Sequence, residues 1–194
     1  MTADATELAR RYGADVPDRD DLTIPPPELF PERPAWIVRG EGGRRALDVM
    51  EWGFPFRTPG KTKMLEKRVT NVRNLESGFW RTALTRPDRR CLVPFTAFSE
   101  YAQRRGADGK LPLHWFDVPS RPIASFAGVW RPVEGGKEAF AFLTCEPNSL
   151  VAPSHPKAMP VVLDDEGEER WLRGELGDLV GPFPAQLMRV DAAE

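Results

Sequence analysis

The stretch Ile123-Ala-Ser-Phe-Ala-Gly-Val-Trp130 decides the fold, because apolar and small residues follow one another along it without an intervening charge. A half-exposed strand alternates polar and apolar positions, whereas a strand covered on both faces reads as a continuous apolar run. We therefore predict that residues 123–130 form a central strand of a sheet, with other parts of the chain packed on both of its faces.

Shorter apolar runs of strand length occur on both sides of this stretch. They predict strands at Ala35 to Val38, Ala46 to Trp52, Cys91 to Val93, Ala97 to Tyr101, Leu113 to Val118, Ala139 to Thr144 and Met159 to Leu163. Twenty Pro and sixteen Gly interrupt the chain in short steps, which favours many short strands joined by turns. We predict an α+β fold whose core is a mixed, largely antiparallel sheet curled into a barrel-like shape, with a few peripheral helices.

Two segments have the features of helices. Thr2 to Tyr12 places apolar residues among charged ones and is followed by Gly13, which is typical of an amphipathic helix with a glycine after its end. Asp164 to Leu172 has its acids in the first turn and an Arg later, the order that suits a helix dipole, and is expected to begin a helical tail. The Pro- and Asp-rich residues 14–33 predict an irregular connection.

Length and composition fit a single soluble domain. With 194 residues, 41% of them hydrophobic, and six Trp, the chain can bury one core, so we expect residues 1–194 to form one domain and the protein to be a monomer. No stretch approaches the roughly 18 apolar residues that span a bilayer, and Met1 to Tyr12 contains no apolar signal region. We therefore expect a cytoplasmic protein with no membrane partner.

The two cysteines, Cys91 and Cys145, each lie inside an apolar run. This placement indicates buried, reduced thiols and supports neither a disulfide framework nor a zinc cluster. We expect no metal and no cofactor.

Charge is distributed unevenly, although the formal net charge is only −2. Between residues 51 and 106 there are twelve Lys or Arg and five acids, whereas from residue 161 onward there are nine acids and three Arg. The aromatic residues of the basic part include Trp52, Phe54, Phe56, Phe79 and Trp80. Cations that follow phosphates and rings that stack on unpaired bases are typical of a single-strand groove. The same composition also fits a solvated basic face above core aromatics.

Two residues have the chemistry of proton transfer. Glu100 ends an apolar strand, where nearby aromatic rings would desolvate its carboxyl group and raise its pKa toward neutrality. His155 lies between Pro153 and Pro156, on a stiff loop before the last predicted strand. Alone, each also fits a plain role, Glu100 as a surface acid and His155 as a residue that stabilises a turn. His114, the other histidine, lies in a predicted strand and is interpreted as structural.

Four further residues are candidates for contact with a nucleic acid. Asn71 and Arg73 are separated by one residue, so in an extended segment they face the same way. There an amide and a guanidinium can hold a sugar hydroxyl and a phosphate. Trp52 can stack on a base, and Lys157 adds a cation two residues after His155. A turn-stabilising Asn, a solvated Arg and a core Trp are equally ordinary interpretations.

The order and wording of these motifs resemble the SRAP family, the SOS-response-associated peptidase domains that guard abasic sites in single-stranded DNA. The resemblance covers about Met50 to Leu163. It is carried by Met50-Glu-Trp-Gly-Phe54, Thr70-Asn-Val-Arg73, Arg90-Cys-Leu-Val-Pro94 with Ser99-Glu-Tyr101, Ala127-Gly-Val-Trp130, Thr144 to Asn148 and His155 to Leu163. Each motif alone is weak, whereas six in the family's order are strong. Two mild departures are Tyr101 for the usual Trp and Ser154 for the usual aliphatic residue.

The resemblance implies an SRAP-like fold and a covalent mechanism. In the family, a cysteine exposed by removal of the initiator Met forms a Schiff base with the ring-opened sugar and then closes to a thiazolidine. By resemblance, Glu100 manages protons at the cysteine's amine and thiol, His155 assists sugar-ring opening and reversal, and Asn71 orients the sugar. Arg73, Trp52 and Lys157 would contact the DNA.

The chain begins Met1-Thr2-Ala3, so this cysteine is missing from it. Three explanations compete. In the first explanation, the true start lies upstream, so that Met1 is an internal residue and a cysteine-led strand precedes it. Alternatively, the protein is a degenerate relative that binds single strands without cross-linking them. In the third explanation, Met1 is removed and Thr2 acts as the nucleophile of an N-terminal hydrolase.

Overall fold

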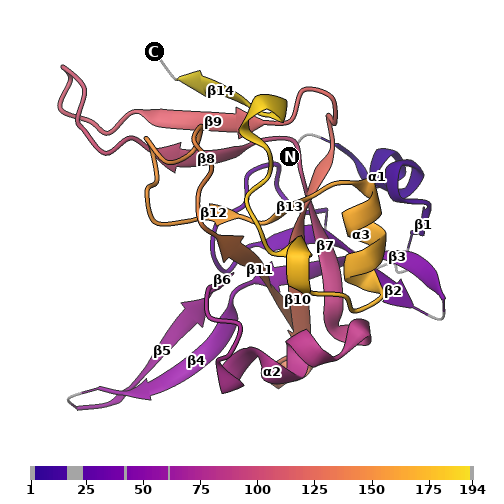
Figure 1. Ribbon diagram of the computed structural model, residues 1–194. Helices are drawn as coiled ribbons and strands as arrows, with labels where there is room; N and C mark the ends of the chain where they lie inside the picture. The colour runs from indigo at the N-terminus through magenta and orange to yellow at the C-terminus, as the bar shows by residue number, and fades with distance from the viewer. Residues whose placement is uncertain (1–2, 17–23, 42, 61, 193–194) are drawn as a thin grey trace.

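The protein is built around β10 (Ala124–Pro132), the strand that the apolar run predicts (Figure 1). The computed structural model describes residues 3–16, 24–41, 43–60 and 62–192. Residues 124–130 are buried, and β10 pairs antiparallel with β7 (Arg90–Phe95) and with β11 (Glu138–Cys145). Gly128 permits this packing, because a Cβ at that position would lie 2.8 Å from atoms of Cys91 and Val93. The prediction of a central strand is confirmed.

The sheet closes on itself. From β7 it continues through β2 (Pro34–Glu41) to β3 (Arg44–Trp52), and all of these neighbours pair antiparallel. β3 then pairs in parallel with β11, at Glu51–Ala139 and Trp52–Phe140, which completes a ring of strands. Two short strands, β1 (Ala14–Asp15) and β6 (Asn71–Val72), add to β3 and β11, respectively, in parallel. The predicted mixed, largely antiparallel and curled sheet is confirmed.

Alternate residues of β10 enter two apolar clusters. Ala127 and Val129 pack in the cluster that also buries residues of α1 (Ala5–Tyr12), α2 (Gly78–Thr85) and α3 (Asp165–Leu172). Phe126 and Trp130 belong to the other cluster, together with Phe116 of β9 (Leu113–Asp117). The central strand is therefore covered on both faces, which explains why its sequence carries no alternation.

The two predicted helices are present with the expected caps. Asp4 accepts a hydrogen bond from the Glu7 amide at the start of α1, and Gly13 follows its end with φ 57°. Thr2, which the prediction included in this helix, lies outside the described residues. At α3, Asp164 accepts a hydrogen bond from the Gly167 amide. Short 3-10 turns at Gly177–Leu179 and Ala185–Leu187 and the strand β14 (Arg189–Ala192) follow α3, so the prediction of a helical tail is wrong beyond it.

The expected strand from Met159 to Leu163 is interrupted. β12 (Met159–Pro160) pairs with β11, whereas β13 (Val162–Leu163) pairs with β10. Val161 lies at the switch, where its N–H donates to the Leu143 carbonyl and its own carbonyl accepts from the Ala127 N–H. The segment therefore changes partners in the sheet while its backbone stays hydrogen-bonded.

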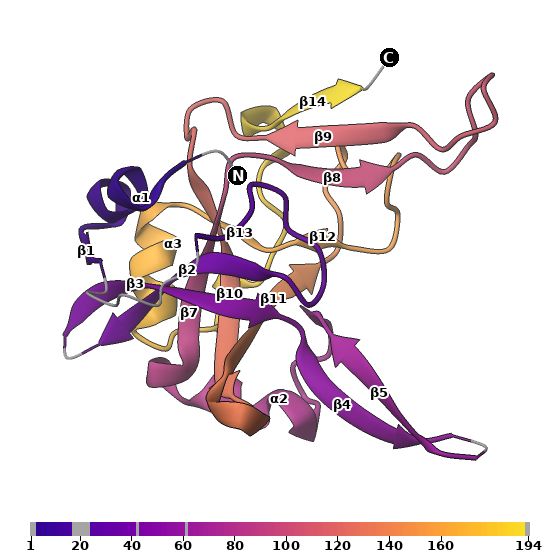
Figure 2. The same ribbon diagram turned by 180° about the vertical axis from the view of Figure 1, so that it is seen from behind.

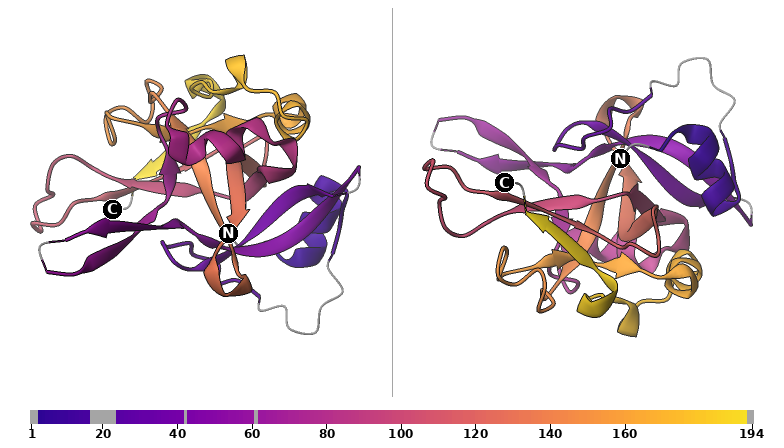
Figure 3. Two further views of the ribbon diagram at one scale, coloured as in Figure 1. Left: turned by 90° about the horizontal axis from the view of Figure 1, so that it is seen from below. Right: turned by 90° about the horizontal axis from the view of Figure 1, so that it is seen from above.

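Two hairpins extend from the same side of the ring, as Figures 1 and 2 and the left view of Figure 3 show. One pairs β4 (Phe54–Pro59) with β5 (Met64–Val69), and the other pairs β8 (Phe98–Tyr101) with β9. β14 adds to the outer side of β9 and completes a small antiparallel sheet. None of the helices in the described part of the chain is long and apolar enough to cross a bilayer.

Candidate active site

The structure brings Glu100 and His155 together. Glu100 lies on β8, and His155 lies in the connection between β11 and β12, residues 146–158. The Nδ1 of His155 and the Oε2 of Glu100 share a hydrogen bond of 2.9 Å. Their side chains are 32% and 25% exposed, so the pair is partly desolvated while solvent still reaches both groups. Such a pair can exchange protons with a bound molecule.

Burial raises the pKa of the Glu100 carboxyl group. His155 acts in the opposite direction through its charge and its hydrogen bond, as does the charge of Arg73, but these effects offset the desolvation only in part. Arg73 therefore lies close enough to Glu100 to act on it electrostatically. A glutamate whose pKa is raised gives up its proton closer to neutral pH, which suits a general acid or base.

Backbone hydrogen bonds fix the loop that carries His155. The carbonyl of Val151 accepts hydrogen bonds of 2.9 Å from the amides of both Ser154 and His155. The side-chain oxygen of Asn148 accepts bonds of 3.0 Å from the amides of Leu150 and Val151, and its Nδ2 donates to the Phe183 carbonyl at 2.7 Å. Asn148 thus ties the loop to the C-terminal segment, and the loop presents His155 on a defined turn.

Asn71 has a buried acceptor without a partner. It lies on β6 opposite Phe142 of β11, and its Oδ1 has no hydrogen-bond partner in the described part of the chain. Buried polar atoms are almost always paired, so an unpaired amide oxygen is available to a donor such as a sugar hydroxyl. No hydrogen bond joins Asn71 to the Glu100–His155 pair among the described residues. Arg73, two positions further on, is exposed and acts on Glu100 through its charge.

Trp52 is half-buried and has one ring face covered. Its ring stacks on that of Phe142, with centroids 5.1 Å apart, and its Nε1 donates to the Thr70 carbonyl at 3.0 Å. Phe54 and Trp80, which the sequence analysis counted among the aromatics of a single-strand groove, are 0% and 4% exposed. For these two residues the interpretation as groove aromatics is wrong, because they pack on each other in the core with centroids 5.1 Å apart.

The basic block is likewise only partly available. Arg90 is buried and donates hydrogen bonds to backbone carbonyl groups. Arg57, Arg68 and Arg86 form ion pairs. Lys157, which follows the His155 turn, is exposed and forms no ion pair within the described residues.

His114 is the residue that sequence reasoning missed. It lies directly opposite Glu100 in the β8–β9 ladder, and its Nδ1 shares a 2.6 Å hydrogen bond with the Oγ of Ser154, the residue before His155. The sequence shows both histidines, but only the register of the hairpin places His114 beside Glu100.

The two cysteines are unsuited to nucleophilic attack. Burial raises the pKa of both thiols, of Cys145 to about 11 and of fully buried Cys91 higher still. Cys91 lies in β7 and is buried as predicted, whereas Cys145 is the last residue of β11 and is only half-buried, so the prediction of a buried thiol is wrong for it. Thr2, the alternative nucleophile, lies outside the described residues. No group of three or more His, Cys, Asp or Glu in the described ranges could hold a metal ion.

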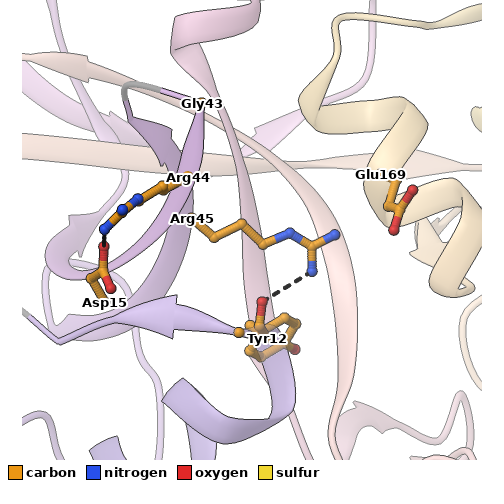
Figure 4. Close-up of a pocket in the computed structure, with 7 residues that line it drawn as sticks. Tyr12, Asp15, Gly43, Arg44, Arg45 and Glu169 are labelled. Atoms are coloured by element: carbon orange, nitrogen blue, oxygen red, sulfur yellow. Dashed lines mark hydrogen bonds and ion pairs between the residues drawn. The ribbon is translucent and has the colours of Figure 1, made fainter.

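An open depression of about 610 Å³ lies near α1, β1 and the start of β3 (Figure 4). Arg44 and Asp15 form an exposed ion pair of 3.8 Å there, and Arg45 donates to the Tyr12 carbonyl at 3.3 Å. The depression shares no residue with the Glu100–His155 pair. Its visible side chains are solvated or already bonded to protein groups, so the candidate site remains at Glu100 and His155.

The sequence of this chain is similar to those of known proteins. The profile of the family described as SOS response associated peptidase (SRAP) matches residues 1–192. The abasic site processing protein YoqW of Bacillus subtilis (strain 168) is 27% identical over 174 residues, which cover 82% of this chain and 75% of that protein. The protein of the same name from Bacillus phage SPbeta matches equally well.

Solved structures show the same fold. A protein from Bacteroides thetaiotaomicron superposes with a TM-score of 0.75 at 24% identity, covering 100% of this chain and 90% of that one. A protein from Bordetella bronchiseptica gives a TM-score of 0.74 at 21% identity, with 97% and 95% covered.

Proposed function

This chain belongs to the SOS response associated peptidase (SRAP) family, and we propose that it processes abasic sites in single-stranded DNA through the Glu100–His155 pair. The observation that carries the proposal is the 2.9 Å hydrogen bond between these two groups, which lie 55 residues apart in sequence and are both partly exposed. The relatives described as abasic site processing proteins support the choice of substrate.

The proposed chemistry is a condensation between the abasic sugar and a cysteine that carries a free α-amine. The amine adds to the aldehyde of the ring-opened sugar and one water leaves, which gives an imine. The thiol sulfur then adds to the imine carbon while its proton passes to the nitrogen, which gives a thiazolidine. Cys91 and Cys145 have no free α-amine and have thiols of raised pKa, so we assign the step to an N-terminal cysteine in a segment ahead of Met1.

Each of the proposed site residues has a separate role. Glu100 accepts protons from the amine and the thiol, and its raised pKa keeps it basic enough for this role near neutral pH. Ring opening moves a proton from the C1′ hydroxyl to the ring oxygen, and we assign this transfer and its reversal to His155. The unpaired Oδ1 of Asn71 accepts a hydrogen bond from the sugar.

The DNA backbone is proposed to pass over the exposed cations beside the pair. Arg73 can hold a phosphate next to Glu100, and Lys157 can hold another beyond His155. Trp52 offers its second ring face to a base, since Phe142 covers the first.

A denaturing-gel assay tests the proposal. The chain with a cysteine-led extension, incubated with single-stranded DNA that contains one abasic site, is expected to give a heat-stable adduct. The same extension with Ser in place of that Cys is the matched control and should give none. Absence of an adduct from the Cys form, with the fold intact, would overturn the cross-linking proposal.

The exposed cations Arg73 and Lys157 also favour a second candidate function, non-covalent binding of single strands. It predicts salt-sensitive affinity for intact single-stranded DNA and no covalent product with abasic DNA. Salt-independent binding would exclude this function. Hydrolysis of a peptide or amide that is lost in Thr2→Ala would instead support the N-terminal hydrolase.

A further inference from the structure

Two paired residues of the β8–β9 hairpin form hydrogen bonds with two consecutive residues of the loop between β11 and β12. Glu100 and His114 are direct partners in the β8–β9 ladder, so their side chains share one face of the hairpin. Ser154 and His155 are consecutive in the loop between β11 and β12. Glu100 bonds His155 at 2.9 Å, and His114 bonds Ser154 at 2.6 Å, so two adjacent hydrogen bonds join the same two segments.

We propose that His114 is a positioning residue, whose hydrogen bond to Ser154 fixes the turn that presents His155 to Glu100. The inference deepens the function proposed above, and its effect on adduct formation rests on that function. The effect of His114 on the geometry of the Glu100–His155 pair does not depend on the proposed function.

A single hydrogen bond leaves a loop free to pivot about it, whereas two adjacent bonds define its orientation. Ser154 is 5% exposed, so its hydroxyl requires a partner inside the protein, and His114 supplies it. On the other side of the turn, Val151 and Asn148 hold the backbone, but within the described residues neither side chain forms a hydrogen bond to β8 or β9. The His114–Ser154 bond therefore sets the turn against the strand that carries Glu100.

A third link between hairpin and loop constrains the orientation of the loop less. The Nε2 of Gln103 donates to the Pro153 carbonyl at 2.9 Å, but this bond is exposed, and Gln103 lies beyond the end of β8. Water can replace an exposed hydrogen bond of this kind at little cost. The strands next to His114 carry Glu100 on β8 and Asp191 on β14, where Asp191 pairs with Trp115, and His155 lies on the loop. Arg73 acts on Glu100 through its charge.

The protonation pattern of His155 is the readout, because it does not require DNA. With Glu100 ionised, the Nδ1 of neutral His155 must carry the proton that enters the hydrogen bond. The chain contains only two histidines, so ¹⁵N NMR of the imidazole rings resolves His155 directly, and a variant of His114 leaves one ring signal.

Two variants of His114 separate the effect of its hydrogen bond from the effect of its side-chain volume. In His114→Phe the ring remains but the bond to Ser154 is lost, and we expect His155 to shift from the Nδ1–H form toward a mixture of tautomers. In His114→Asn the side-chain amide replaces Nδ1 in the bond, and we expect the wild-type pattern to be kept. Ser154→Ala removes the other partner with a minimal change of volume and should reproduce His114→Phe, which keeps the test valid if the Phe variant does not fold.

Adduct formation supplies the second readout. With the cysteine-led extension, His114→Phe and Ser154→Ala should each lower the rate roughly ten- to a hundredfold, and the double variant should be no slower than the slower single one. Arg105→Ala is the control, because its side chain bonds only to Gly109 within the same hairpin. An unchanged His155 tautomer in the folded Phe and Ala variants would overturn the inference. If the extended chain without a further substitution forms no adduct, the proposed function fails while the NMR result still decides the role of His114.

Discussion

Two partly or fully buried glutamates show how one side chain serves different ends in this protein. Glu168 of α3 is 1% exposed and is held by two guanidinium groups, from Arg11 at 3.0 Å and Arg121 at 2.8 Å, and by the Ser125 hydroxyl at 2.8 Å. Glu100 is 25% exposed, and its one hydrogen-bonded side-chain partner among the described residues is His155.

The partners make the difference. Arginine stays protonated at any physiological pH, so Glu168 faces two permanent positive charges and links α1 to α3 and the sheet. Glu100 forms no ion pair with an arginine among the described residues, and burial raises its pKa, so the pair at Glu100 can exist in more than one protonation state. A buried charge with permanent counter-charges builds the fold, whereas an open pair of titratable groups is suited to chemistry.

The largest expected effect comes from breaking the structural pair. Glu168→Ala leaves the partly buried Arg11 and Arg121 with Asp165 as their remaining acidic partner among the described residues, and it leaves the Ser125 hydroxyl with Tyr12 as its remaining side-chain partner there. The free energy of unfolding should therefore fall by about 3–5 kcal/mol. Urea unfolding followed by circular dichroism measures the loss. The control is Glu169→Ala on the same helix, where an exposed ion pair of 3.8 Å with Arg173 should matter by less than about 1 kcal/mol. Equal losses for both variants would contradict the comparison.

Breaking the open pair should affect the reaction and spare the fold. His155→Ala and Glu100→Gln are each expected to slow adduct formation roughly 10²- to 10⁴-fold, the usual contribution of a general acid or base. The expected effect of the Glu100 substitution on stability is opposite to that of the Glu168 substitution. Because the pKa of Glu100 is raised, the folded state binds more protons, and wild-type stability falls as pH rises from the ordinary glutamate value through the raised one.

Glu100→Gln removes this penalty, so at neutral pH its Tm should equal or exceed that of the wild type. Glu134→Gln, at an exposed position, is the matched control for both measurements and should leave the rate unchanged. A large loss of stability in Glu100→Gln together with an unchanged adduct rate would assign Glu100 to the fold.

How far the sequence predicts this molecule depends on how local the determinants are. The apolar run at 123–130 and the caps of α1 and α3 are local, and the structure follows them. The β4–β5 hairpin was not predicted, because Pro55 and Pro59 argue against a strand, yet β4 pairs only with β5 and tolerates both. α2 was missed as well, since its helical face is defined by packing of Trp80 against Phe54 from another element.

The site shows the same limit. Motif order predicts Glu100, His155 and Asn71, and the structure joins the first two. The hydrogen bond between His114 and Ser154 depends instead on the register of the hairpin, which pairs Glu100 with a residue 14 positions later. The break at Val161 likewise depends on competition between β10 and β11 for one segment. Strand pairings between distant parts of the chain produce no periodic pattern in the sequence, so they cannot be predicted from it.

A smaller effect sharpens the role of the neighbouring charge. Arg73→Gln removes a positive charge that lowers the pKa of Glu100, so this pKa should rise further and less of the carboxylate should be ionised at a given acidic pH. In a plot of the adduct rate against pH, the acid limb should therefore move to higher pH. The rate on that limb should be roughly two- to fivefold lower, as expected for a solvent-exposed charge interaction. Arg81→Gln, which removes an exposed charge from the same basic block, should leave the limb in place.

The smallest expected effect compares a cation that has an ion pair with one that has none. Lys137 is held by Glu51 at 2.6 Å, whereas Lys157 forms no ion pair among the described residues and lies two positions after His155. If Lys157 binds a phosphate, Lys157→Ala should reduce the slope of log affinity for single-stranded DNA against log salt by about 0.7, the counterion released at one contact. Fluorescence anisotropy across a salt series measures the slope, and Lys137→Ala should leave it unchanged. Equal slopes in wild type and Lys157→Ala would place the DNA backbone elsewhere, because a cation that releases no counterions does not contact a phosphate.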